Sequence, residues 1–160
     1  MTDTAEKILQ NSIGVIDRFG WYCGSGSDTL GGVEVHGGCM MECLAMGAGH
    51  HAGYWGAIID AAEGKTLDNF DPQPELLVAF DALRRAVKDT EWYAKRLENI
   101  RQDMDNNPDF HDEGDTAEGI ADSGEIVYEW NDSPSTGGCT GPDEARAMFQ
   151  KAIKLLPAAV

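Results

Sequence analysis

The sequence predicts a mainly α-helical, compact domain over residues 1–160, of the α+β kind only in having minor strand content. Three observations support this fold class. Apolar residues recur at helical spacing near both ends and in the middle of the chain. Hydrophobic residues make up 42% of the 160 residues, which is enough for one buried core. One late segment alternates with the period of a strand, so we expect one long helix and a short strand or hairpin.

The N-terminal part should form three helices. The first begins near Asp3 or Thr4, either of which can cap free backbone amides, and ends before Gly20. A glycine-rich loop follows, with a short extended piece at residues 33–35. The second helix begins near Cys39 and fades at residues 47–49, and a third runs over residues 54–62.

The best-defined element should be a long helix that starts at Pro74. Apolar residues recur every three or four positions from Leu76 to Met104, so a helix of roughly 30 residues would be about 45 Å long. Such a stripe is typical of an intramolecular core. Association of two copies through this face is the alternative, although Thr90 and Arg101 interrupt the stripe.

Residues 105–124 combine acids with turn-forming residues and lack periodicity, so we expect a long mobile loop there. Residues 124–132 alternate like a strand. A turn, SPSTGGCTGP, comes next. Thr140 then caps the last helix, with Asp143 in the capping-box position, and the apolar face of that helix runs to Leu156.

Charge is unevenly distributed along the chain. The net charge is −16, and residues 102–145 contain thirteen acids and no Lys or Arg, whereas half of the twelve basic residues lie between Arg84 and Arg101. A surface of this sign repels nucleic acid and anionic membranes, so neither is an expected partner. A solvated surface is one explanation and protein binding is another. The partner-binding residues we predict are Arg84, Arg85, Lys88, Arg96, Asp103, Asp105, Asp109 and Asp112.

The chain shows no signal-peptide pattern at its start and no apolar run long enough to cross a membrane. We therefore expect a cytoplasmic protein whose four cysteines are reduced. No cofactor is expected, because Gly24 to Ser27 follows no clear strand and lacks a lysine. The stretch DMDNNPDFH resembles a calcium loop but has Pro108 and Gly114 at the positions that need Gly and Glu.

Three short motifs, taken in order, carry a family resemblance. They are GW (Gly20 and Trp21), the small-residue helix CMMECLAMGAG and the late WNDSP, which precedes a capping threonine and a closing helix. This order resembles an uncharacterised family of small proteins from actinobacteria and their bacteriophages, marked by GW, Cys-x-x-x-Ala/Cys and WND-P-x-T. The resemblance covers residues 5–60 and 125–156.

The sequence departs from that pattern in two places. GGC is inserted before Thr140, and residues 74–124 are longer than the motifs require. The resemblance implies no reaction and no catalytic residue. It implies that Trp21 and Trp130 pack in or beside the core, and that Asn131 and Asp132 shape the turn before the last helix.

The stretch GGCMMECLAMGAGHH allows three kinds of chemistry. Cys39 and Cys43, one helical turn apart, could share a zinc ion. His36 and His50 lie on the same stripe but about 20 Å apart along a straight helix, so a bend, or Cys23 from the loop, would be needed. The interpretation we favour is a core helix whose small residues permit close packing, with His50 and His51 at its exposed end.

Cys39 is also the candidate nucleophile. It follows two glycines where a helix would begin, so the helix dipole would favour its thiolate. His111 and either Asn131 or Asp132 would then complete a papain-like arrangement.

The leading hypothesis is a small acidic protein of phage type that binds or modulates a host protein without catalysing a reaction. Its basis is the lack of a complete catalytic constellation together with the segregated charge. The alternatives are a cysteine-dependent, hydrolase-like enzyme centred on Cys39 and an acidic inhibitor that mimics DNA.

Overall fold

The computed structural model describes residues 3–21, 29–30, 33–34, 38–65 and 70–158, and this part of the chain is mainly helical, as predicted. Strand structure there is confined to one antiparallel pair, β1 with β2, in which each strand is two residues long. The strands are β1 (Thr29–Leu30) and β2 (Val33–Glu34). The α-helices are α1 (Ala5–Phe19), α2 (Met40–Gly47), α3 (Trp55–Ala62), α4 (Pro74–Lys88), α5 (Glu91–Asn106), α6 (Ala117–Ala121), α7 (Ile126–Asn131) and α8 (Pro142–Lys154). Three short 3₁₀ helices are η1 (Ala52–Tyr54), η2 (Pro108–Phe110) and η3 (Pro134–Thr136).

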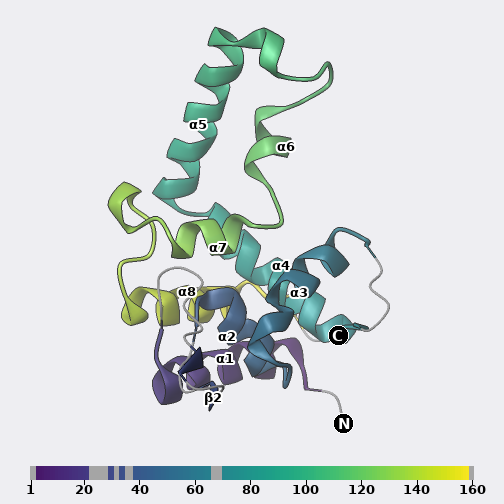
Figure 1. Cartoon of the computed structure of the whole chain (residues 1–160), viewed down its shortest axis with the longest axis vertical. Coiled ribbons are helices and arrows are strands. Elements are labelled where there is room, and N and C mark those ends of the chain that lie inside the picture. Colours follow the sequence, from purple (N-terminus) through teal and green to yellow (C-terminus); the bar gives the residue numbers. More distant parts are fainter. Residues whose placement is uncertain (1–2, 22–28, 31–32, 35–37, 66–69, 159–160) are drawn as a thin grey trace.

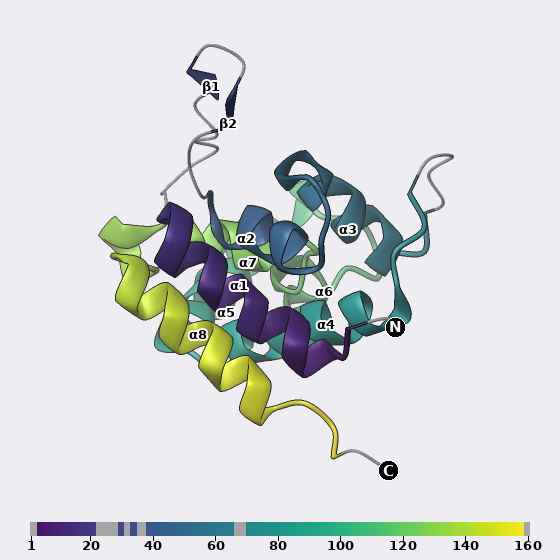
Figure 2. The same ribbon diagram turned by 90° about the horizontal axis from the view of Figure 1, so that it is seen from below.

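The helices form a packed body and a projecting arm (Figure 1). In the body, α1 lies against α2, α4 and α8, and Figure 2 shows α1 and α8 side by side along one edge. The arm consists of α5 and the returning segment that contains α6, and it extends away from the body. One apolar cluster fills the body; its largest fully buried side chains are Ile8, Leu9, Met40, Met41, Leu44, Ile58, Leu76, Phe80, Leu83, Val87, Ile126 and Phe149.

The first helix forms as predicted. The hydroxyl of Thr4 accepts a hydrogen bond from the amide of Lys7 (3.2 Å), which caps the first turn. Ile8 and Leu9 are buried on one face of the helix. Gly20 ends it with a φ of 93°, a conformation that glycine adopts without a steric penalty.

The prediction of one long helix is wrong, because the chain breaks between α4 and α5. Thr90 leaves the helical conformation, with φ −129° and ψ 155°. Its hydroxyl donates to the carbonyl of Val87 (2.6 Å) and accepts from the amide of Tyr93 (3.2 Å). One side chain thus closes α4 and caps α5. The break redirects α5 out of the body to form the arm (Figure 1).

The segment 105–124 has more regular structure than the predicted loop, because it contains η2 and α6. Thr116 caps α6 by accepting from the amide of Gly119 (3.0 Å), and Ala117 and Ala121 are buried. The mobility of this segment stays a prediction.

The predicted strand at residues 124–132 is also wrong, because α7 occupies this segment. Its buried residues are Ile126, Val127, Trp130 and Asn131. Ile126 and Trp130 lie four positions apart, as do Val127 and Asn131, so all four residues lie on one face of a helix. The alternation of large and polar residues gave the wrong period because Val127 is as deeply buried as Ile126.

Capping of the last helix by Thr140 and Asp143 is a further wrong prediction. Pro142 occupies the first turn of α8, which places the cap at Gly141, and no side chain at the cap makes a capping bond. The backbone amide of Thr140 instead donates to the carboxylate of Glu144 (2.9 Å). Asp143 pairs with Arg146 (2.6 Å).

Candidate functional site

The three motifs of the sequence meet at the side chain of Asn131, which is fully buried. The indole N–H of Trp21 donates to Asn131 Oδ1 (2.6 Å), and the backbone amide of Met40 donates to the same oxygen (3.1 Å). The Asn131 amide group in turn donates to Asp132 Oδ1 (2.8 Å). Residues up to 110 positions apart are therefore joined through one amide side chain.

This junction replaces a local cap on α2. Cys39 occupies the N-cap position but makes no side-chain capping bond. The amide of Met40 belongs to the first turn, where amides have no partner within the helix, and Asn131 supplies the missing acceptor from α7. The role of Asn131 is thus wider than shaping the following turn. Trp130 is buried and Trp21 packs against the core, as the resemblance implied.

The GGC segment, residues 137–139, packs onto the same junction. The amides of Gly138 and Cys139 donate to the carbonyls of Ser133 (2.8 Å) and Trp130 (2.9 Å). A Cβ at Gly138 would overlap the carbonyls of Trp130 and Ser133, so only glycine fits without displacement of the backbone. Gly138 and Cys139 are therefore buried parts of this junction, whereas Gly137 is exposed.

The environment of Cys39 disfavours nucleophilic chemistry. Its side chain is buried, and this burial raises the pKa of the thiol to about 12. Burial likewise raises the pKa of Cys43 to about 11. A thiol with such a pKa stays protonated at neutral pH, whereas the attacking species is the thiolate. Desolvation thus outweighs the helix dipole that suggested a reactive Cys39.

The structure also separates Cys39 from its predicted partner His111. His111 follows η2 at the far end of the arm and lies 3.1 Å from Asp103 of α5, whereas α2 lies in the body (Figure 1). Asn131 does lie beside α2, but its amide is engaged by Trp21, Met40 and Asp132. This geometry does not assemble the papain-like arrangement.

A metal centre finds no support in the part of the chain that the structure describes. Within the described ranges no three His, Cys, Asp or Glu side chains group in a way that could hold an ion. Cys23 and His36 lie outside those ranges. The ring of His50 packs against the rings of both Tyr54 and Phe70, with centroids 5.9 Å and 5.1 Å away, and the exposed His51 accepts from the amide of Gly53 (3.0 Å).

The basic and acidic stretches of the sequence pair with each other. Arg84 and Lys88 both contact the carboxylate of Asp122 (2.8 and 3.0 Å), and Arg96 contacts Glu129 (2.7 Å). These ion pairs join α4 and α5 to the returning chain around α6 and α7. Four of the predicted partner-binding residues therefore have partners inside the chain, since Arg85 contacts Asp81 (3.2 Å) as well.

The predicted acidic residues behave differently, because they remain exposed at the far end of the arm. We call residues 103–113 the arm tip. Asp103 accepts from Asn107 (3.0 Å), and Asp105, Asp109 and Asp112 are exposed to solvent. Phe110 is 86% exposed among them. Phe110 is not among the predicted site residues, although it is an aromatic residue within an acidic stretch that has no helical apolar face.

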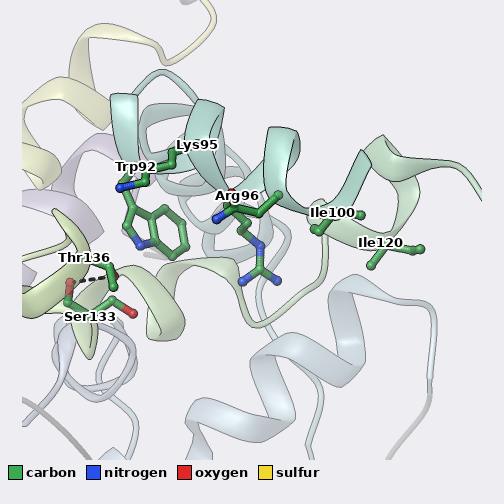
Figure 3. Close-up of a pocket in the computed structure, with 8 residues that line it drawn as sticks. Trp92, Lys95, Arg96, Ile100, Ile120, Ser133 and Thr136 are labelled. Carbon is green, nitrogen blue, oxygen red and sulfur yellow. Dashed lines mark hydrogen bonds between the residues drawn. The ribbon is translucent and has the colours of Figure 1, made fainter. Parts of the chain in front are cut away.

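A cleft of about 440 Å³ lies at the base of the arm. Figure 3 shows the Trp92 indole of α5 on the side of Ser133 and Thr136, with Arg96 extending beside it, while Ile100 of α5 lies next to Ile120 of α6. We call this the arm-base cleft. It combines apolar walls with two cationic side chains, Lys95 and Arg96, and two hydroxyl groups.

Within the described ranges no helix is both long and apolar enough to cross a membrane.

Comparison with known proteins assigns the chain to a family. A family of unknown function, DUF6197, has a sequence model that matches residues 1–155. The chain belongs to the DUF6197 family. Its match runs through residues 74–124, which the short motifs did not cover, so the arm lies within the extent of DUF6197. No curated protein and no solved structure matches the chain. An uncharacterised family is thus confirmed.

Proposed function

We propose that this DUF6197 protein is a non-enzymatic binding protein whose arm tip contacts a basic host protein. The order of the GW, Cys-led and WNDSP motifs supports an actinobacterial or bacteriophage origin, and with it a partner in the host cytoplasm. The acidic surface argues against nucleic acid or an anionic membrane as the binding partner.

The exposure of Phe110 is the observation that supports this function most directly. An aromatic side chain that is 86% exposed gains about 2–3 kcal/mol when a partner buries it fully. Aromatic residues of this kind are typical anchors at protein interfaces. Nothing in the packing of the arm requires an aromatic residue here, since no residue of η2 is buried.

The acids around Phe110 define the kind of surface that it fits. Asp105, Asp109 and Asp112 are exposed on both sides of Phe110 in the sequence. These carboxylates accelerate the approach of a positively charged partner and disfavour the binding of an acidic protein. The matching surface is therefore an apolar pocket with a rim of Lys and Arg. A DNA mimic would instead compete with DNA for its target, and a hydrolase would need a more reactive Cys39.

The test compares two exposed apolar residues. Tagged wild-type protein, Phe110→Ser and the control Val78→Ser are used to capture proteins from an actinobacterial lysate at low and high salt. Val78 is 40% exposed on α4 in the body. A partner held by wild type and Val78→Ser, but at least tenfold weaker with Phe110→Ser, supports the proposal. Equal capture by all three proteins refutes it.

Two further samples separate the alternatives. The triple variant Asp105→Asn, Asp109→Asn, Asp112→Asn should weaken capture more at low salt than at high salt, because screening reduces charge attraction. Added duplex DNA should leave the complex intact, whereas displacement of the partner by DNA would favour the DNA mimic. Sedimentation of the purified protein shows whether its partner is a second copy, which would replace the host protein in the proposal.

A further inference from the structure

We propose that the arm-base cleft is a second site, independent of the arm tip, that binds a small monocarboxylate carried on a flat apolar body. Three features of the cleft lead to this ligand class: its size, its wall chemistry and its local charge. None of them is used by the proposed function.

The size and walls suit a small organic molecule. A volume of about 440 Å³ lies within the range of roughly 300–1,000 Å³ that is usual for such sites. The indole of Trp92, itself 8% exposed, forms one wall, and Ile100 and Ile120 form another (Figure 3). The guanidinium of Arg96 lies 5.6 Å from the Trp92 ring centroid, which holds both groups in place. Flat apolar surfaces of this kind accept an aromatic or similarly planar body.

The charge at the cleft is opposite to that of the protein. The chain carries −16 overall, yet no acidic residue is among the described residues that line the cleft. Of the six basic residues between Arg84 and Arg101, five pair with a carboxylate of this chain. Lys95 is the exception within the described part of the chain, and it lies exposed on the cleft wall beside Asn99. An ammonium group and an amide donor are thus available to an anion.

The same features favour a single negative charge over a phosphate. Arg96 is engaged by Glu129 (2.7 Å), so it cannot offer its full guanidinium fork to a ligand. One free ammonium group, Lys95, balances one negative charge. A second ligand charge would remain unpaired in the field of a protein with net charge −16. The matching group is therefore a carboxylate.

The experiment titrates three probes that share one ring system and follows backbone amide shifts by NMR. The probes are 2-naphthoate, the neutral 2-naphthylmethanol and the dianionic 2-naphthyl phosphate. We expect saturable shifts at Trp92, Ile100 and Ile120, with naphthoate bound most tightly at low salt. Lys95→Met should weaken naphthoate binding about two- to fivefold, the effect of one exposed ion pair, and leave naphthylmethanol binding unchanged.

Lys7→Met is the matched control, since Lys7 is an exposed lysine on α1 that does not line the cleft. The proposal is overturned if naphthoate causes no saturable shift at millimolar concentration, or if its shifts map away from the cleft. It is also overturned if the phosphate binds more tightly than the carboxylate, or if Lys95→Met and Lys7→Met have the same effect. Each of these outcomes leaves the arm-tip proposal untouched, because Phe110 does not line the cleft.

Discussion

Replacing Asn131 with alanine should destabilise the fold strongly, because this side chain joins α7 to Trp21 and to the start of α2. Asn131 is fully buried, and its side-chain oxygen is the acceptor for both Trp21 Nε1 and the Met40 amide. Asn131→Ala removes that oxygen and leaves both donors without it. The first turn of α2 then loses an acceptor that Cys39 does not provide.

The expected decrease in the free energy of unfolding follows from the burial of the two N–H donors that Asn131 accepts from. The Met40 amide is buried, and an unsatisfied buried donor costs about 1–3 kcal/mol. Trp21 is only half-buried, so water can satisfy its indole N–H and its contribution should be about 1 kcal/mol. Together the free energy of unfolding should fall by about 2–4 kcal/mol. For a chain of this size, each kcal/mol lowers Tm by about 2–4 °C.

Urea denaturation followed by circular dichroism measures this loss, with thermal melting as a second measurement. Asn106→Ala is the matched control, because Asn106 is exposed at the end of α5 and its truncation should change the free energy of unfolding by less than about 0.5 kcal/mol. If Asn131→Ala also stays within about 0.5 kcal/mol of wild type, Asn131 does not hold the three motifs together.

Three further predictions concern the helix break, the ion pairs and the thiols. Thr90→Ala removes the cap of α5 and should lower the free energy of unfolding by about 1 kcal/mol in urea denaturation; an unchanged midpoint would contradict the capping role. Asp122→Asn removes the carboxylate that Arg84 and Lys88 share. It should lower the free energy of unfolding by up to about 1 kcal/mol at low salt and by less at high salt, because all three groups are partly exposed. Burial raises the pKa of Cys39 to about 12 and of Cys43 to about 11, so their contribution to stability is complete below the ordinary thiol pKa and is lost as pH rises toward these values. The urea midpoint should accordingly fall above about pH 9, and a thiol reagent should label both residues slowly at neutral pH; rapid labelling of the folded protein would refute this.

The sequence predicts those helices whose signals are local. In α1, Thr4 caps, Ile8 and Ile16 repeat at helical spacing and Gly20 stops the helix. The break at Thr90 was missed because the apolar spacing continues almost unchanged from α4 into α5, so periodicity alone joins them. A threonine can continue a helix or cap one, and only the bonds to Val87 and Tyr93 decide between these roles.

The candidate sites depend more heavily on contacts that a single sequence cannot give. The motifs implied that Trp130 lies near the core, but the bonds from Trp21 and Met40 to Asn131 link residues more than 90 positions apart. The charge segregation was visible in the sequence, whereas its pairing through Asp122 and Glu129 was not. Exposure also depends on the fold, which is why Phe110 was not predicted as an anchor.

Photo-crosslinking at the arm tip tests the central claim, that this tip is where a partner binds. A photoreactive phenylalanine derivative at position 110, and separately at the control position 78, would be irradiated in the lysate of an actinobacterial host. We predict one dominant protein adduct at position 110 that weakens with salt, and no such adduct at position 78. Equal adducts at both positions, or none at position 110, would contradict the claim.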